Sequence, residues 1–227
     1  MKEIYLIRHG ETNWNKEGKS QGSESDVSLN EAGIYQSQIT GKYLKKYRLK
    51  DENFDCIYSS PMRRTRETAT IISDILFYNN KIIYLKGLGK DKVGKLTGLT
   101  KSDPLKVKFN LRLNELMPID PIERYEVDIE NIVSQEMDIG IDSNIELKIK
   151  CKNVIDDIIN SNYKKIIIVS HGSIIYRIIS LLFKIPTVPY GDLKNSSNCH
   201  ITYITHSESE GFNMVSPPNT EHISIPL

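Results

Sequence analysis

Two segments far apart in the sequence share one pattern, an apolar run of strand type that ends on a histidine and a glycine. The first is IYLIRHG at residues 4–10, and the second is IIIVSHG at residues 166–172. Short runs rich in β-branched and aromatic residues predict buried strands. If these strands are parallel neighbours, His9 and His171 lie at the same edge of an open α/β sheet, which is where such folds bind ligands.

The adjacent Arg8 and His9 have the chemistry of a phosphoryl-transfer site. A neutral imidazole can attack a phosphorus atom, and the guanidinium of Arg8 offers a planar set of donors to the phosphoryl oxygens. A histidine in an ordinary turn after a strand is the alternative for either segment alone. The recurrence of the pattern at His171 favours a functional pair.

A third segment, CIYSSPMRRTRETA at residues 56–69, predicts a strand followed by a helix that runs to about residue 76. Ser60 is the expected N-cap, with Pro61 at the first helical position. The first turns of this helix contain three arginines, Arg63, Arg64 and Arg66. Helix N-termini favour anions, so an arginine there would strengthen a phosphate site. For Arg63 and Arg66 we expect a solvated basic face instead.

Other patterns extend this alternation of strands and helices. Two Ser-x-x-Glu sequences, at residues 28–31 and 143–146, have the spacing of helix capping boxes, and they predict helices that run to about residues 47 and 160. Residues 200–205 predict a late strand, with residues 212–215 as its hairpin partner.

Five short motifs carry a resemblance to a known family. They are RHGETNWN at 8–15, QG at 21–22, SLNEAG at 28–33, SSPMRRTRETA at 59–69 and SHG at 170–172. In their order and approximate spacing, the chain resembles the histidine phosphatase superfamily, the phosphoglycerate mutase-like group. The resemblance covers nearly the whole chain. It implies an α/β fold, a three-layer αβα sandwich with a mostly parallel central sheet.

The resemblance also implies roles for the residues at matching positions. His9 would accept the phosphoryl group, and Arg8, Arg64 and His171 would complete the phosphate pocket. A charged His171 and the two arginines would neutralise the phosphoryl oxygens, while the same positive charges keep His9 neutral. No metal and no other cofactor would then be needed. The positions expected to line the substrate site are Asn15, Gln21, Gly22 and Gly172.

One element of the family pattern differs in this sequence. Relatives carry a glutamate general acid in the stretch that corresponds to LGKDKVGKLTGLT at residues 88–100. Aligning the glycines places Lys90 at the position of this glutamate. We expect Lys90 to bind the substrate and the adjacent Asp91 to be a catalytic residue. A lysine of lowered pKa could donate the proton. Asp91 could instead turn toward the substrate and donate it, or Glu115 could donate it from the next segment. The remaining alternative is a catalytically impaired relative that binds phosphorylated ligands.

Two other phosphate chemistries fit the sequence poorly. GKDKVGKL at residues 89–96 resembles a Walker A loop, but Leu96 occupies the position of the hydroxyl that must coordinate magnesium. A cysteine phosphatase needs an arginine after five intervening residues, and Cys56 reaches Arg63 only after six. The three cysteines, Cys56, Cys151 and Cys199, also lack the paired spacing of a metal site.

Composition is typical of a single globular enzyme. With 227 residues and a net charge of +1, the chain can form one domain with a substantial core, and its charge gives no reason to expect nucleic-acid or membrane binding. Its apolar runs are too short to span a bilayer. An odd number of cysteines favours a reducing compartment, so we expect a cytoplasmic protein. Nothing in the composition indicates an oligomeric state.

Residues 101–142 predict an insertion that lies over the strand ends of the single domain formed by residues 1–227. This stretch combines three prolines with a weakly amphipathic, charged pattern. In relatives such a segment caps the pocket and selects the substrate. The stretch lacks the paired-arginine, tryptophan-containing pattern of glycolytic mutases, since the only tryptophan is Trp14. We therefore expect hydrolysis of a small phosphate ester through a phosphohistidine on His9, with phosphoglycerate mutase activity as the alternative.

Overall fold

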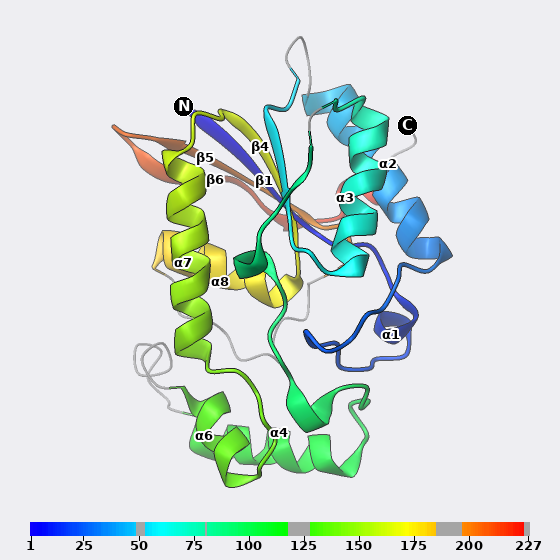
Figure 1. The fold of residues 1–227 in the computed structure, drawn as a ribbon, viewed down its shortest axis with the longest axis vertical. Helices are drawn as coiled ribbons and strands as arrows, with labels where there is room; N and C mark the ends of the chain where they lie inside the picture. Colours follow the sequence, from blue (N-terminus) through cyan, green and yellow to red (C-terminus); the bar gives the residue numbers. More distant parts are fainter. Residues whose placement is uncertain (49–52, 80, 118–127, 185–196, 225–227) are drawn as a thin grey trace.

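The computed structural model describes residues 1–48, 53–79, 81–117, 128–184 and 197–224, and its centre is a six-stranded sheet (Figure 1). The strands lie in the order β3-β2-β4-β1-β5-β6. Four of them are parallel, and β5 and β6 are antiparallel to their neighbours. Their bounds are Lys2–Arg8 (β1), Cys56–Ser59 (β2), Ile83–Tyr84 (β3), Lys165–Ser170 (β4), Ile201–Ser207 (β5) and Gly211–Asn219 (β6).

Helices cover both faces of the sheet, which gives the predicted three-layer α/β sandwich. On one face α2 and α3 pack against the sheet, and on the other α7 and α8 do so. The helix bounds are Asn13–Lys16 (α1), Glu31–Arg48 (α2), Arg63–Leu76 (α3), Pro104–Leu116 (α4), Ile129–Glu136 (α6), Asn144–Asn160 (α7), Gly172–Phe183 (α8) and Glu221–Ser224 (α9), with 3-10 turns at Lys86–Leu88 (η1) and Gly94–Leu96 (η2).

The alternation of side chains along β1 explains why both faces are covered. Ile4 and Leu6 pack into the cluster beneath α7 and α8, whereas Tyr5 and Ile7 pack into the cluster beneath α2 and α3. All four side chains are at most 2% exposed. Burying each such side chain contributes about 1.5–3 kcal/mol, so both helical layers are needed to cover this strand.

The register of β1 and β4 brings the two predicted motifs together. Arg8 at the end of β1 pairs with Ser170 at the end of β4, and the His9 amide donates to the Ser170 carbonyl at 3.0 Å. The residue that follows each strand is a histidine, so His9 and His171 lie at the same edge of the sheet, as predicted from the sequence.

Two predicted helix starts are wrong, and each has a local cause. α2 begins at Glu31, and the side chain that caps it is Asn30, which accepts from the Gly33 amide at 2.8 Å, so Ser28 is not the cap. α3 begins at Arg63 after Met62, because the Ser60 hydroxyl bonds to His171 and only weakly, at 3.3 Å, to the Met62 amide.

Other predicted elements are confirmed. Ser143 caps α7 by accepting from the Glu146 amide. The hairpin of β5 and β6 is slightly longer than expected and carries Pro217 and Pro218 on β6. β6 is the edge strand of the sheet, where a missing N–H is tolerated.

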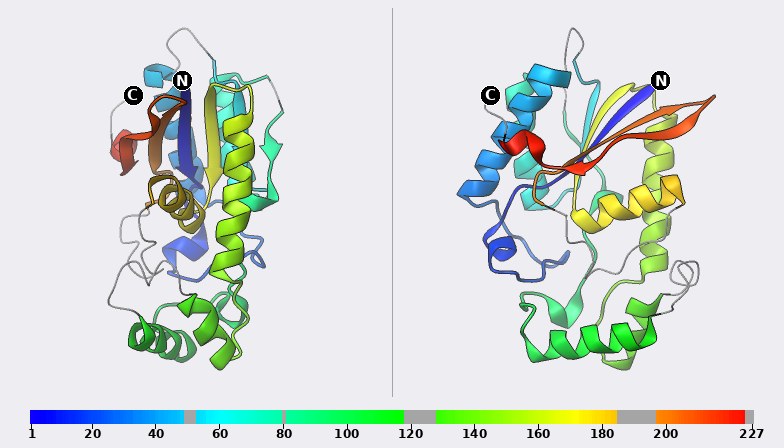
Figure 2. Two further views of the ribbon diagram at one scale, coloured as in Figure 1. Left: turned by 90° about the vertical axis from the view of Figure 1, so that its left-hand side faces the viewer. Right: turned by 180° about the vertical axis from the view of Figure 1, so that it is seen from behind.

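The segment predicted as an insertion forms α4 and α6, which lie together at one end of the molecule (Figures 1 and 2). β1 runs from the opposite end toward them, so this segment lies beyond the carboxyl ends of the parallel strands. It has a hydrophobic cluster of its own, which includes Phe109, Leu113 and Val133 together with Leu96 of η2. Residues 118–127, with two of the predicted prolines, lie outside the described residues.

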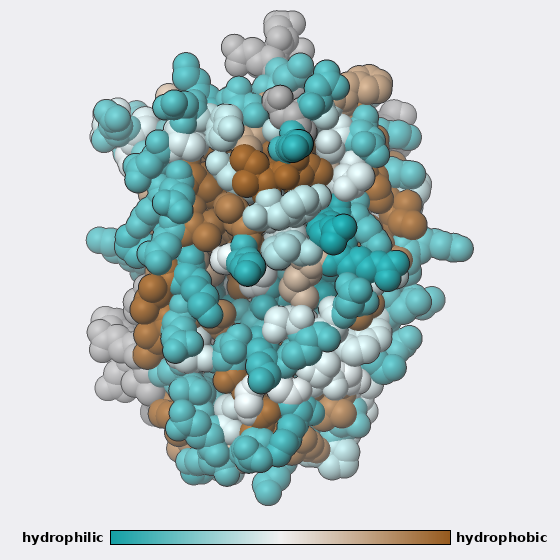
Figure 3. All heavy atoms as spheres, in the orientation of Figure 1, coloured by the Kyte–Doolittle hydropathy of each residue, from teal (hydrophilic) through white to brown (hydrophobic). Residues whose placement is uncertain are grey.

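No helix within the described ranges combines the length and the apolar composition needed to cross a bilayer. The face seen in Figure 3 is largely hydrophilic, with hydrophobic side chains in scattered groups.

Candidate active site

The two motif histidines form the centre of the site. The rings of His9 and His171 are 5.3 Å apart between centroids, at an angle of 63°. Their exposed fractions are only 4% and 1%. Parallel pairing of the strands therefore produces a buried pair of imidazoles from residues more than 160 positions apart in the chain.

Hydrogen bonding fixes the tautomer of His9. Its Nδ1 lies 2.7 Å from the carbonyl oxygen of Gly10. A carbonyl can only accept, so Nδ1 carries the hydrogen and Nε2 keeps its lone pair. Burial lowers the pKa of His9 well below its usual value, and the charges of Arg8 and Arg64 lower it further. His9 is therefore neutral near pH 7, as a nucleophile must be.

The loop after His9 is held by close backbone contacts that require glycine. A Cβ atom on Gly10 would lie 2.4 Å from the Gly33 carbonyl oxygen, and one on Gly33 would lie 2.1 Å from the Glu11 carbonyl oxygen. The Gly10 amide also donates to the Thr68 hydroxyl at 3.0 Å. The RHG and SLNEAG motifs therefore pack directly against each other, and they position His9 together.

Of the three arginines at the start of α3, Arg64 faces the site. Its side chain is 1% exposed, and it donates to the Ser25 carbonyl at 3.1 Å. Its charge lowers the pKa of both histidines. Arg63 instead pairs with Glu67 at 2.9 Å on the outer surface, and Arg66 lies over the ring of Tyr84.

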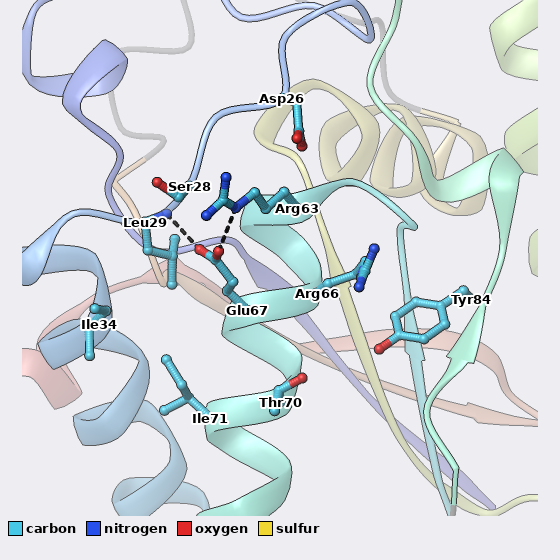
Figure 4. Close-up of a pocket in the computed structure, with 10 residues that line it drawn as sticks. All are labelled: Asp26, Ser28, Leu29, Ile34, Arg63, Arg66, Glu67, Thr70, Ile71 and Tyr84. Atoms are coloured by element: carbon cyan, nitrogen blue, oxygen red, sulfur yellow. Dashed lines mark hydrogen bonds and ion pairs between the residues drawn. The ribbon is translucent and has the colours of Figure 1, made fainter.

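Arg63 and Arg66 line a surface groove on the outer side of α3, which Figure 4 shows. The groove also includes Ile34 of α2 and Ile71 of α3. The expectation of a solvated basic face for these two arginines agrees with this placement.

His171 forms the start of α8, and its surroundings determine its charge. Its Nε2 lies 3.0 Å from the Ser60 hydroxyl, and its buried Nδ1 has no hydrogen-bond partner among the described residues. Burial lowers the pKa of His171 well below its usual value, and Arg64, His9, Lys90 and Arg8 lower it further. His171 is therefore neutral in the ligand-free site, because its surroundings are already cationic, and the charged His171 expected with a phosphoryl group bound stays a prediction. A bound phosphate dianion would raise its pKa.

The residues expected to line the substrate site surround the loop that follows His9. The Asn15 side-chain oxygen accepts from the Thr12 amide at 3.2 Å, and the Thr12 hydroxyl donates to the Gln21 side-chain oxygen at 3.1 Å. At Gly22 a Cβ atom would lie 2.7 Å from a methyl group of Val93. Gly172 is the first residue of α8.

Asn198 joins this loop to the turn before β5, and it was not predicted. Its side-chain amide donates to the His9 carbonyl at 3.0 Å and to the Asn15 side-chain oxygen at 3.2 Å. No motif marks this position, because its role depends on a contact across the fold.

Lys90, at the position of the family glutamate, belongs to a buried ion cluster. Its ammonium group donates to the Ser173 hydroxyl at 3.0 Å and lies 3.4 Å from Asp91 Oδ2. The same carboxylate oxygen accepts from Arg177 of α8 at 2.7 Å. Sequence reasoning missed Arg177, which sits in an otherwise apolar helix and carries no motif. Ser173 directly follows the SHG triplet, so the cluster borders the histidine pair.

This geometry argues against two of the three candidate acids. Burial would raise the pKa of Asp91, but the charges of Lys90 and Arg177 outweigh it and the pKa is lowered. Asp91 is therefore ionised near pH 7 and a poor proton donor. Glu115 is exposed on α4 and pairs with Arg112 at 3.1 Å, so it faces solvent.

Comparisons with known proteins identify the family of this chain. A family model described as the histidine phosphatase superfamily (branch 1) matches residues 4–219. "Putative phosphoserine phosphatase 2" of Hydrogenobacter thermophilus is 29% identical, over 93% of this chain and 91% of its own. A 2,3-bisphosphoglycerate-dependent phosphoglycerate mutase of Hamiltonella defensa is 39% identical, but the match spans only 45% of this chain and 40% of that protein.

Solved structures show the same architecture. Phosphoserine phosphatase of Entamoeba histolytica, in complex with 3-phosphoglyceric acid, has a TM-score of 0.68 and 26% identity, over 98% of this chain and all of its own. Phosphoglycerate mutase of Bacillus anthracis has a TM-score of 0.73 and 20% identity, over 98% of this chain and 95% of its own. With these matches and the family model, the chain belongs to the histidine phosphatase superfamily.

Proposed function

We propose that this protein is a phosphomonoesterase that transfers the phosphoryl group of a small phosphorylated metabolite to His9 and then to water. The observation that carries the proposal is the neutral His9 with an available Nε2, 5.3 Å from His171 between ring centroids and beside the charges of Arg8 and Arg64. Attack by Nε2 on phosphorus would form a phosphohistidine, and water would hydrolyse it in a second step.

The surrounding cations stabilise the charge that the transition state carries. Arg8 and Arg64 offer planar donors to the phosphoryl oxygens, and the unpartnered His171 Nδ1 offers another donor when a dianion has raised its pKa. The N-terminus of α8 adds amide groups at the same place. These groups would supply the electrostatic stabilisation that phosphoryl transfer needs without a metal ion or other cofactor.

Positive charge on residues 101–142, the proposed capping segment, favours substrates with a second anionic group. Lys106 of α4 bonds to the hydroxyl of Ser20, next to the predicted substrate loop. Its pKa is lowered by burial and then by the charges of Lys101 and Lys90, so several ammonium groups share one region. A carboxylate on the leaving group would relieve that repulsion. Phosphorylated hydroxy acids and amino acids are therefore the first substrates to test.

Phosphoglycerate mutase activity is the second candidate. A "Probable phosphoglycerate mutase" of Yersinia pestis is 27% identical, over all of this chain and 97% of its own. Residues 101–142 lack the adjacent arginines expected of a glycolytic mutase, which favours hydrolysis.

A substrate panel separates these functions. Purified protein would be incubated with p-nitrophenyl phosphate, phosphoserine, 3-phosphoglycerate and glucose 6-phosphate, and both inorganic phosphate and 2-phosphoglycerate would be measured. We expect release of inorganic phosphate, fastest from carboxylate-bearing esters. Formation of 2-phosphoglycerate without phosphate release would establish the mutase instead. Binding of these esters without turnover would indicate the impaired relative.

A further inference from the structure

A carboxyl group of α6 lies within electrostatic range of Lys90, the residue at the position of the family's usual acid. Glu130 is the second residue of α6 and was not among the candidates from the sequence. The charges of Arg177, Lys90 and Asp91 all act on it. Glu130 therefore lies within electrostatic range of the ion cluster formed by Lys90, Asp91 and Arg177.

A continuous chain of hydrogen bonds fixes the first turn of α6 beside that cluster. Asp128, the N-cap of α6, accepts from the Ser143 hydroxyl at 2.8 Å and from the Asn144 amide at 2.6 Å. The Asn144 side-chain oxygen accepts from Arg177 Nε at 2.9 Å, and Arg177 binds Asp91. The start of α6 is thus tied through α7 and α8 to the residue next to Lys90.

The surroundings of Glu130 suit a proton donor. Its side chain is half-buried, and within the described residues its carboxyl oxygens take part in no hydrogen bond or ion pair. Burial raises the pKa of Glu130, and the charges of Asp91 and Asp128 raise it further, although Arg177 and Lys90 lower it. The carboxyl group therefore keeps its proton to higher pH than an exposed glutamate does.

We propose that Glu130 donates the proton to the leaving oxygen, and that Lys90, in the place of the usual acid, serves as a cation for the phosphoryl group. This inference rests on the proposed hydrolysis through His9. The general acid would then belong to α6 in the capping segment, whereas the family pattern places it in the loop after β3.

The proposed transfer exchanges one bond to phosphorus for another and moves one proton. His9 Nε2 forms a bond to phosphorus, and the bond from phosphorus to the ester oxygen breaks, with its electron pair left on that oxygen. The O–H bond of Glu130 breaks at the same time, and its proton forms the hydroxyl of the departing alcohol. The resulting carboxylate then takes a proton from the water that attacks the phosphohistidine, which restores Glu130.

The test compares Glu130→Gln with Glu136→Gln, a control at the exposed end of the same helix, where the side chain pairs with Arg112. Each variant and the wild type would be assayed on phosphoserine, an alkyl ester, and on p-nitrophenyl phosphate, whose leaving group hardly needs a proton. For Glu130→Gln we expect alkyl kcat to fall by about 10²- to 10⁴-fold and aryl kcat to stay within about threefold. Glu136→Gln should match the wild type on both.

The pH profile gives a second readout that a structural role would not move. In the wild type, alkyl kcat/KM should fall as pH rises through the pKa of Glu130, because the donor loses its proton. That fall should be absent in Glu130→Gln and present in Glu136→Gln.

Equal losses on both esters, or no loss on either, would overturn the assignment of Glu130. If the wild type itself forms no phosphohistidine and hydrolyses neither ester, the proposed function fails, and the inference fails with it. The two failures are distinguishable because p-nitrophenyl phosphate turnover depends on His9 and not on the acid.

Discussion

At the scale of single residues, the site is defined by which groups stay neutral inside a cationic pocket. His9 and His171 are both buried beside Arg8 and Arg64, and their pKa values are lowered. Under the proposed function, this arrangement would give a nucleophile that needs no deprotonation and a pocket that is cationic before the substrate binds. A phosphate dianion neutralises the pocket, so binding and catalysis use the same charges.

The adjacent Arg63 and Arg64 provide a matched test of this electrostatic account. Arg64→Ala removes a buried cation from the phosphate pocket, so kcat/KM for p-nitrophenyl phosphate should fall by about 10²-fold or more. Arg63→Ala removes an exposed cation paired only with Glu67 in the same helix, and should change kcat/KM less than twofold. Inhibition by inorganic phosphate should weaken only in Arg64→Ala. Similar losses in both variants would show that the helix end, rather than Arg64, binds the phosphate.

The residues that sequence reasoning missed share a physical feature. His9, Arg64 and His171 were predictable because each stands in a motif at a strand or helix end. Arg177 and Glu130 carry no such signal, because their roles arise from contacts between segments that are distant in the chain. The neutral state of His171 in the ligand-free site also carries no sequence signal, since a pKa depends on burial and on the charges of neighbours from distant segments.

At the scale of elements, the C-terminal helix is held by a buried, neutral histidine. His222 of α9 is 2% exposed, and its Nε2 lies 2.9 Å from the Thr40 hydroxyl of α2. Burial lowers the pKa of His222 to about 4. Protonation would place a charge between α9 and α2, so this contact should weaken in acid.

The sign of the pH effect follows from this lowered pKa. The unfolded chain binds the proton near pH 6.5, whereas the folded protein binds it near pH 4. The stability from neutral His222 is therefore complete above pH 6.5 and is lost progressively as pH falls toward 4. The loss from this residue at pH 4.5 is about 2 to 3 kcal/mol.

Urea unfolding of the wild type and His222→Phe at pH 7.0 and pH 4.5 checks this prediction. The variant should lose about 2 to 3 kcal/mol less free energy of unfolding than the wild type between the two pH values. The pKa of His200 is lowered to about 4 mainly by burial and by Arg8. His200 is present in both proteins, so they differ at this residue only by the lesser effect of His222 on its pKa. Equal pH dependence in both proteins would contradict the account.

At the scale of elements, the sequence predicted strands better than helix starts. The strands were recognisable because both faces of the central strands are buried, so their apolar runs are continuous. The starts of α2 and α3 were misplaced because Asn30 and not Ser28 caps α2, and because Ser60 bonds to His171 across the site. The start of α3 therefore depends on a tertiary contact.

At the scale of the whole molecule, the sheet edge that carries His9 and His171 faces α4 and α6, which share a hydrophobic cluster separate from those of the sheet. The two parts are joined by polar contacts. The Asp142 carboxylate accepts from the Lys92 amide at 2.9 Å, and Lys106 bonds to Ser20. This division lets the capping segment vary while the phosphate pocket stays fixed, which fits a family whose relatives include both phosphatases and mutases.

Because the protein's own cations would stabilise the transition state, EDTA should leave the turnover of p-nitrophenyl phosphate unchanged. Vanadate, which mimics a five-coordinate phosphorus, should inhibit it competitively. Both effects would be measured by steady-state kinetics at pH 6.0. Loss of activity with EDTA that magnesium restores would show that a metal takes part.

The central claim is that His9 carries the phosphoryl group between substrate and water, and direct trapping tests it. Protein would be mixed with a ³²P-labelled substrate, quenched in alkali within seconds, digested and sequenced by mass spectrometry, with His9→Ala as the control. We expect a label that is stable in alkali, labile in acid and located on His9, and no label or turnover in the variant, which should unfold at a similar temperature. A label on another residue, or turnover that persists in His9→Ala, would contradict the account.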